Sequence, residues 1–244
     1  MNKQWKKFDE LTDRCYTDMI RNSTDMKNWN SCFGQLTEII SDGRAQNPDF
    51  ARELYLLDDE TDYEHGVQGW LEDYLDELDM CEKYDELEAV CRKLLEMFAW
   101  EEDSPSDLRF SLTSALRNQG KAEEALSYCE DWAAKETDNP YAAAALIYAK
   151  IAVNDLEGAE DVVRRHISDD TECGEENDMI FIAASRLYQK NGNKKMEKEM
   201  NHAIEEYDEK LEEELMGMDD EEFDPWDDED FDSIDKALPF DWHM

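Results

Sequence analysis

The spacing of apolar residues constrains the fold of this chain more than any other feature of its sequence. Apolar side chains recur at intervals of three and four residues, a period that matches one face of an α-helix. The N-terminal stripe of this kind consists of Trp5, Phe8, Leu11, Cys15 and Met19. Only nine Gly and five Pro occur in 244 residues, and no run of β-branched residues alternates with polar ones. The pattern therefore predicts an all-α protein without a sheet.

Residues 1–66 are predicted to form N-terminal helices, as one or two degenerate pairs. A second apolar stripe covers residues 26–40, and Gly43 follows it at a place where glycine commonly ends a helix. Pro48 predicts the start of a further helix, because proline is tolerated in the first helical turn. The polar stretch of residues 58–66 predicts a turn before the next helix.

Residues 67–216 are predicted to form successive helix pairs, each joined by a short turn. The clearest unit covers residues 106–140, where Gly120 separates a leucine-rich helix from one that carries the small residue Ala125. The next unit repeats this plan and places Ala159 34 residues after Ala125. Both alanines are expected where two helices approach closely. The remaining turns are predicted near Glu82, at Asn154 and at Gly192.

This plan resembles the tetratricopeptide-repeat family over about residues 68–207, because 34 residues is the period of that family. The likeness implies an α-solenoid of stacked antiparallel helical hairpins, whose neighbours bury one continuous core and leave a concave groove. Two features depart from the family pattern. Arg109 and Ala143 stand where the family has an aromatic residue, and Thr113 and Ile147 stand at the Gly of its Leu-Gly pair.

The resemblance places the first helix of each pair along the groove. Residues of these helices that point away from the hairpin core are the candidate partner-binding residues: Phe110, Ser114, Arg117, Tyr148, Phe181, Ser185 and Tyr188, together with Arg186, which lies one residue beyond this stripe and is expected to reach the groove rim with its long side chain. Aromatic and Arg residues dominate binding hot spots, so this set predicts a peptide-binding surface. The alternative is that the aromatic residues only pack between neighbouring pairs. Glu72 and Asp76 stand at groove positions where chaperone-binding members of the family carry the Lys and Asn that grip a carboxylate.

The composition changes near the C-terminus, so residues 217–244 are predicted to be an acidic tail. Ten of the fourteen residues 219–232 are acidic. Such a segment buries too little surface to order itself unaided. The tail nevertheless carries aromatic residues, which are candidate contact residues: Phe223, Trp226, Phe231, Phe240 and Trp242. Two hypotheses follow, either a tail that docks on the groove of its own chain or a tail that stays free and presents a motif to another protein.

The charge of the chain restricts its partners. With 65 acidic and 25 basic residues, the net charge is −40. A negative field of this size repels phosphate backbones, so direct binding of nucleic acid or of an anionic membrane is not expected. It favours a protein or peptide partner that is basic or of mixed aromatic character, unless the charge serves only solubility. A different class of function is an acidic nucleic-acid mimic, for which residues 56–88, dense in Asp and Glu, are the candidate region.

No motif for catalysis or for cofactor binding is present. The chain has neither a glycine-rich phosphate loop nor an H-E-x-x-H sequence, and its four His and six Cys are scattered rather than clustered. We therefore predict no catalytic residue, no metal, no cofactor and no enzymatic activity, with a divergent enzyme as a further alternative. The absence of an apolar N-terminal run, of a long apolar stretch and of paired Cys motifs predicts a reduced, cytoplasmic protein.

The sequence thus predicts a helical-repeat module for protein–protein interaction, an adaptor or chaperone-like scaffold. It would hold a peptide segment or a basic partner in its concave groove. The sequence does not specify the oligomeric state.

Overall fold

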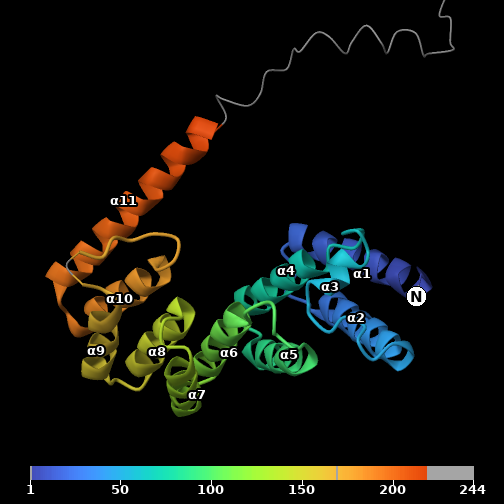
Figure 1. The fold of residues 1–244 in the computed structure, drawn as a ribbon, viewed down its shortest axis with the longest axis horizontal. Helices are drawn as coiled ribbons and strands as arrows, with labels where there is room; N and C mark the ends of the chain where they lie inside the picture. The colour runs from blue at the N-terminus through green and yellow to red at the C-terminus, as the bar shows by residue number, and fades with distance from the viewer. Residues whose placement is uncertain (1, 169, 219–244) are drawn as a thin grey trace, which may run out of the picture.

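The computed structural model describes residues 2–168 and 170–218, and Figure 1 shows their arrangement. These residues form eleven helices and no strand, which confirms the prediction of an all-α protein for this part of the chain. The helices are α1 (Asn2–Ile20), α2 (Lys27–Gln46), α3 (Leu56–Asp59), α4 (Val67–Met80), α5 (Tyr84–Met97), α6 (Ser106–Asn118), α7 (Ala122–Lys135), α8 (Pro140–Ala152), α9 (Leu156–His166), α10 (Asp178–Asn191) and α11 (Lys194–Met218).

Successive helices pack largely as adjacent pairs. The pairs are α1 with α2, α4 with α5, α6 with α7, α8 with α9, and α10 with α11. Neighbouring pairs contact one another through their first helices, α6 against α8 and α8 against α10. Figure 1 shows the helices following one another along the molecule from α1 to α10, with α11 extending away from this body. The second helix of a pair also packs on the first helix of the next pair, α5 against α6 and α7 against α8, so the packing is continuous from α4 to α11.

The turns inside the last four of these pairs share one backbone conformation, which also ends α1 at Asn22, where φ is 52° and the Ser23 N–H donates to the Asp18 carbonyl at 3.0 Å. Glu82, Gly120, Asn154 and Gly192 all have left-handed φ angles, between 55° and 78°. The next residue donates its N–H to the carbonyl five residues earlier: Lys83 to Leu78, Lys121 to Leu116, Asp155 to Lys150 and Asn193 to Tyr188, at 2.8–3.0 Å. This bond is the signature of a Schellman helix end. The four predicted turns are therefore confirmed, and they recur as one repeated structure.

Two expectations for the N-terminal helices are wrong. Helix α2 runs through Gly43 to Gln46, and a Cβ at position 43 would lie 2.2 Å from a ring carbon of Phe50. Gly43 is therefore needed for close packing rather than as a helix stop. No helix begins at Pro48, because the left-handed φ of 47° at Ala51 interrupts any helical course. The next helix is the single turn α3.

The core consists of two clusters with different side chains. The N-terminal cluster contains stacked aromatic rings from α2 and α4, with ring centroids of Trp70 and Tyr74 5.4 Å apart and those of Trp29 and Trp70 6.0 Å apart. The C-terminal cluster is rich in small residues: Ala142, Ala143, Ala144, Ala145, Ala149, Ala159, Ala183 and Ala184. Ala125 and Ala159 are both fully buried, as predicted for close helix contacts.

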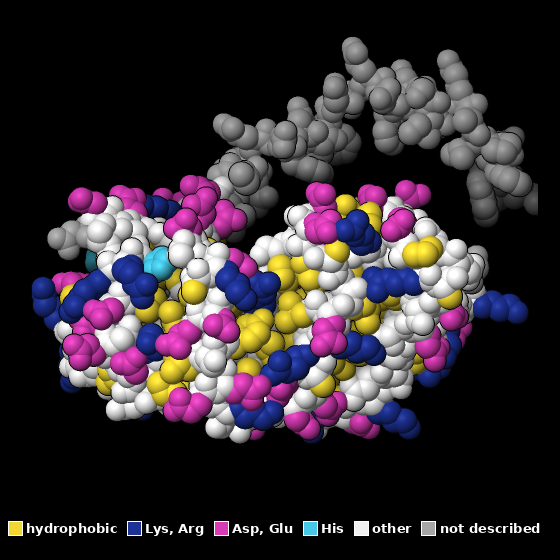
Figure 2. Space-filling view, turned by 60° about the horizontal axis from the view of Figure 1, so that its bottom comes forward, with side chains coloured by type: hydrophobic (Ala, Val, Ile, Leu, Met, Phe, Trp, Pro, Cys, Tyr) yellow, Lys and Arg dark blue, Asp and Glu magenta, His cyan; other side chains and the backbone are white. Residues whose placement is uncertain are grey.

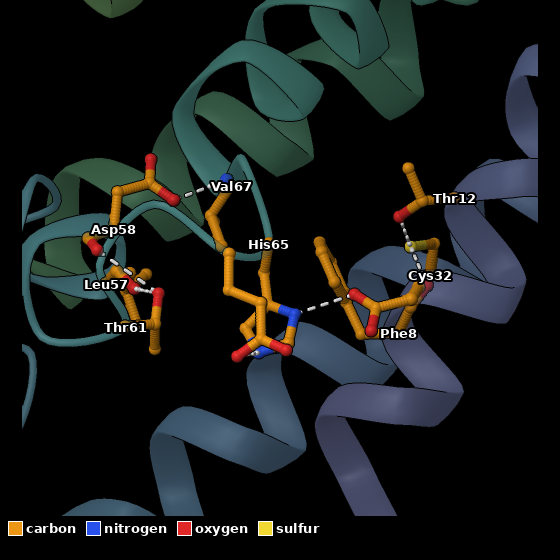
Figure 3. A network of polar contacts seen from close by, with 10 residues as sticks. Phe8, Thr12, Cys32, Leu57, Asp58, Thr61, His65 and Val67 are labelled. Carbon is orange, nitrogen blue, oxygen red and sulfur yellow. Dashed lines mark hydrogen bonds and ion pairs between the residues drawn. The ribbon is translucent and has the colours of Figure 1, made fainter. Parts of the chain in front are cut away.

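The loop before α4 is fixed by buried polar contacts, which Figure 3 shows. The Asp58 carboxylate accepts hydrogen bonds from the backbone N–H of Val67 at 2.6 Å and of Gln68 at 2.9 Å. It thereby satisfies donors at the N-terminus of α4 that have no partner within the helix. The His65 ring stacks on Trp5 at 4.4 Å, and its Nδ1 lies 2.8 Å from the Asp9 carboxylate. These contacts fix the start of α4, which lines the first of the two surfaces described next.

Candidate functional site

An apolar cleft of about 550 Å³ opens between α4, the end of α5, the segment 98–105 and the start of α6. Its hydrophobic lining residues are Leu54, Leu71, Leu75, Leu94, Trp100, Pro105, Leu108 and Phe110. Four exposed carboxylates also line it: Glu72, Asp76, Asp103 and Asp107. None of its lining residues is basic. We call this surface the apolar cleft.

The segment 98–105 forms one wall of the apolar cleft and has a strained backbone. Trp100 has a left-handed φ of 55°, an uncommon conformation for a bulky residue. Its indole Nε1 is buried and has no hydrogen-bond partner among the described residues. The wall is nevertheless anchored, because the Ala99 N–H donates to the Arg52 carbonyl at 2.9 Å and Arg52 pairs with Glu101 at 2.5 Å. Strain of this kind is found at binding and switch sites, where surrounding contacts maintain it.

Electrostatics at the apolar cleft favour a cationic ligand. Partial burial raises the pKa of Asp76, and the neighbouring carboxylates of Asp73 and Asp79 raise it further. A positive ligand group beside these neighbouring carboxylates would offset their mutual repulsion. Apolar side chains of the same ligand would cover the half-buried Leu75 and Trp100.

A second surface, the basic hollow, lies at the C-terminal ends of α6, α8 and α10. It has a volume of about 670 Å³ and is lined by Arg117, Tyr148, Ile151, Arg186, Gln189 and Lys190. Three of these six residues are cations and none is acidic, in a chain with 65 acidic and 25 basic residues. A cation in the last turn stabilises its own helix, because the C-terminal end of a helix dipole is negative. This effect explains in part why Arg117 and Lys190 occur at the ends of α6 and α10.

Arg117 is the central cation of the basic hollow. Its guanidinium carbon lies 4.9 Å from the ring centroid of Tyr148, and its Nε donates to the Thr113 carbonyl at 3.3 Å. Burial lowers the pKa of Arg117. Within residues 2–168 and 170–218, neither Arg117 nor Arg186 nor Lys190 forms an ion pair. The three cations therefore remain available to an anion.

Helix α6 connects the two surfaces. Phe110 lines the apolar cleft and Arg117 lines the basic hollow, with the half-buried Ser114 between them. These residues lie on one stripe of α6, whose ends are separated by about 10 Å at 1.5 Å per residue. The Phe110 ring also packs edge-on against Tyr148, 6.2 Å away. Figure 2 shows hydrophobic side chains gathered across the middle of one face, with Lys and Arg side chains beside them.

The structure brings some of the predicted partner-binding residues together and buries others. Arg117, Tyr148 and Arg186 meet around the basic hollow. Phe181 and Tyr188 lie in the C-terminal core cluster, where their exposed fractions are only 2% and 3%. Ser185 is half-buried and its hydroxyl lies 2.5 Å from the Asn201 side-chain oxygen on α11. The five predicted tail residues lie outside the described part of the chain: Phe223, Trp226, Phe231, Phe240 and Trp242.

Sequence reasoning missed residues on both surfaces. Trp100 and Asp103 lie in a connecting segment without helical period, so no sequence pattern places them beside α4. Lys190 follows Arg186 by four residues on α10. Because residues four apart share a helix face, this spacing was a usable signal.

Several carboxylates of the acidic region 56–88 make internal contacts. Asp58 caps α4, and Asp73 accepts a hydrogen bond from the Tyr16 hydroxyl at 2.8 Å. Glu88 accepts hydrogen bonds from Gln119 and Lys121 at the turn after α6. Its pKa is raised by burial but lowered more strongly by these donors and by Arg92, to about 2. Some carboxylates of this acidic region therefore stabilise the packing of the helix pairs.

Comparisons with protein-family models, with curated proteins and with solved structures find no match for this chain. In the described ranges, no three His, Cys, Asp or Glu side chains gather where they would hold a metal ion. None of the helices there has both the length and the apolar character needed to cross a membrane. The apolar cleft and the basic hollow are therefore the two features of the described residues that bear on function.

Proposed function

We propose that the protein is a peptide-binding scaffold whose apolar cleft holds a basic amphipathic segment of a partner protein. The observation that supports this most strongly is the composition of the apolar cleft, with hydrophobic lining residues, four exposed carboxylates and no basic residue. A segment with apolar residues on one face and Lys or Arg on the other matches both features. Recognition of an amphipathic helix in a groove is a recurrent mode of peptide binding.

The repeated helix pairs support a scaffold of the tetratricopeptide type as the framework of this proposal. The four turns are equivalent, and the 34-residue spacing of Gly120 and Asn154 matches the period of that family, whereas the outer spacings, Glu82 to Gly120 and Asn154 to Gly192, are 38 residues. In such arrays the first helices line the groove, and α4 and α6, the first helices of their pairs, both contribute residues to the apolar cleft. A protein that holds a partner segment in this way would act as an adaptor or a chaperone-like scaffold.

A synthetic amphipathic helix with Leu on one face and Lys on the other tests the proposal. Fluorescence anisotropy should show that it binds at least about tenfold more tightly than the same helix with Glu in place of Lys, because carboxylates line the apolar cleft. The double substitution Glu72→Gln/Asp76→Asn should weaken binding about threefold to tenfold and should slow association more than it speeds dissociation. Photo-crosslinking from position 75 in cells would then identify the natural partner.

The matched control removes two carboxylates from α11, as Glu205→Gln/Glu209→Gln, outside both surfaces. Both residues are exposed and neither forms an ion pair with a described residue. If this control weakens binding as much as Glu72→Gln/Asp76→Asn does, the peptide responds only to net charge and the proposal fails. Binding that does not respond to salt would contradict it as well, because exposed charges are screened.

A further inference from the structure

The basic hollow stands out because its charge opposes that of the chain. Arg117, Arg186 and Lys190 converge on it without a carboxylate partner among the described residues. Arg117 is held by the Thr113 carbonyl and the Tyr148 ring, so its guanidinium is ordered before any ligand arrives. Ordered guanidinium groups favour carboxylates, which they bind through paired hydrogen bonds. The site therefore suits an acidic ligand with aromatic residues, the opposite of the ligand proposed for the apolar cleft.

We propose that the occupant of the basic hollow is the acidic tail of the same chain, residues 219–244. This segment combines the two required chemistries, since ten of its first fourteen residues are acidic and aromatic residues are interspersed among them. Carboxylates of the tail pair with Arg117, Arg186 and Lys190. Phe or Trp rings of the tail pack on Tyr148 and Ile151. The proposal goes beyond the peptide-binding function of the apolar cleft and does not depend on it.

The length of the chain permits this contact. Helix α11 has 25 residues and so measures about 37 Å at 1.5 Å per residue. The 26 residues after Met218 span up to about 90 Å when extended, more than twice the length of α11. They therefore reach back to the end of α10, where the basic hollow lies. Because the tail is covalently attached, its effective concentration there is on the order of millimolar, so even a weak contact is populated.

The test compares the full chain, a chain truncated after Met218 and a synthetic peptide of residues 219–244. The peptide should bind the truncated chain and should bind the full chain at least about tenfold more weakly, because the attached tail already occupies the site. In hydrogen exchange, amides of residues 107–118 and 178–189 should exchange more slowly in the full chain than in the truncated one.

Charge variants of the truncated chain locate the site. Arg186→Gln/Lys190→Gln should weaken peptide binding about tenfold, because two charge-assisted contacts are lost. Both side chains are exposed, so folding is not expected to suffer. The matched control is Lys3→Gln/Lys7→Gln on α1, which removes the same charge from exposed positions at the other end of the chain and should change binding less than about twofold.

Three results would overturn the proposal. The first is a failure to locate the site: the peptide does not bind the truncated chain, or it binds the truncated chain equally with and without Arg186→Gln/Lys190→Gln. The second is equal binding of added peptide to the full and truncated chains, which shows that the tail does not occupy the site in its own chain. The third is protection of the two helices that appears only as protein concentration rises, which assigns the tail to a second copy. The basic amphipathic helix that probes the apolar cleft gives an independent result, so the two proposals fail separately.

Discussion

The N-terminal part of the molecule, α1 to α6, and the C-terminal part, α7 to α11, follow the same hairpin plan but fill their cores differently. Large aromatic residues such as Trp29, Trp70 and Tyr74 occupy the first core, whereas alanines dominate the second. Aromatic residues fill the space between helices that are farther apart, and alanines let helices approach closely. The turns are the same in both parts, so the same helical hairpins pack around either an aromatic or an alanine-rich core.

The two parts also differ in the ligand that their surfaces suit. The apolar cleft lies largely in the N-terminal part and combines hydrophobic and acidic residues, while the basic hollow lies mainly in the C-terminal part and gathers cations. A chain with one overall charge thus presents two local environments of opposite sign. Net charge describes long-range steering, whereas the residues that line a surface determine what it binds.

The largest effect is expected from removing aromatic volume in the N-terminal core. Trp70→Ala should lower the free energy of unfolding by about 3–5 kcal/mol, because Trp70 is almost fully buried and its removal leaves a cavity. Urea denaturation measures the change. The control Met80→Ala affects an exposed side chain of the same helix and should change stability by less than about 0.5 kcal/mol. A small effect of Trp70→Ala would show that the aromatic stack does not stabilise this part.

The opposite volume change should be harmful in the C-terminal core. Ala159→Leu should cost about 1–3 kcal/mol, because Ala159 is fully buried and the added methyl groups force the helices apart. Thermal unfolding provides the measurement. Ala152→Leu, at an exposed position near the end of α8, is the control and should be nearly neutral. Equal stability of the two variants would contradict the close approach of helices inferred for this part.

The smallest effect concerns the turns that the two parts share. Glu82→Gly should raise stability by about 0.5 kcal/mol, because a residue with a Cβ is strained at the left-handed φ of 55° and glycine is not. Asn154→Gly in the C-terminal part should raise stability by less, since Asn adopts the left-handed conformation more readily than Glu does. Denaturation midpoints of the two variants, measured side by side, decide the comparison. A loss of stability in Glu82→Gly would show that the Glu82 side chain makes a contact that outweighs the strain.

Much of the fold was predictable because it depends on local signals. The turns at Gly120, Asn154 and Gly192 were predictable because Gly and Asn adopt left-handed φ angles readily. The helices were predictable from the helical spacing of the apolar residues. The error at Gly43 has a tertiary cause. The ring of Phe50 packs against Gly43, so a residue that resembles a helix stop lies inside α2.

The candidate surfaces were predictable only in part. Helical spacing placed Arg117 on the predicted stripe and Arg186 one residue beyond it, and the structure brings both to the basic hollow. Phe181 and Tyr188 satisfied the same spacing but are buried, because the contacts of α10 with α8 and α11 determine which of its faces is covered. Spacing defines the faces of a helix but not which face meets solvent.

The sequence by itself determined the helical class, the four paired turns and the negative net charge, since each depends on residue type and short-range spacing. The tertiary structure alone decided that Trp100 and Asp103 lie beside α4 and that three cations from α6 and α10 meet around Tyr148. These residues are far apart along the chain, and only the packing of successive helix pairs brings them into contact. Surfaces that bind a partner arise from such long-range neighbours, which no local pattern specifies.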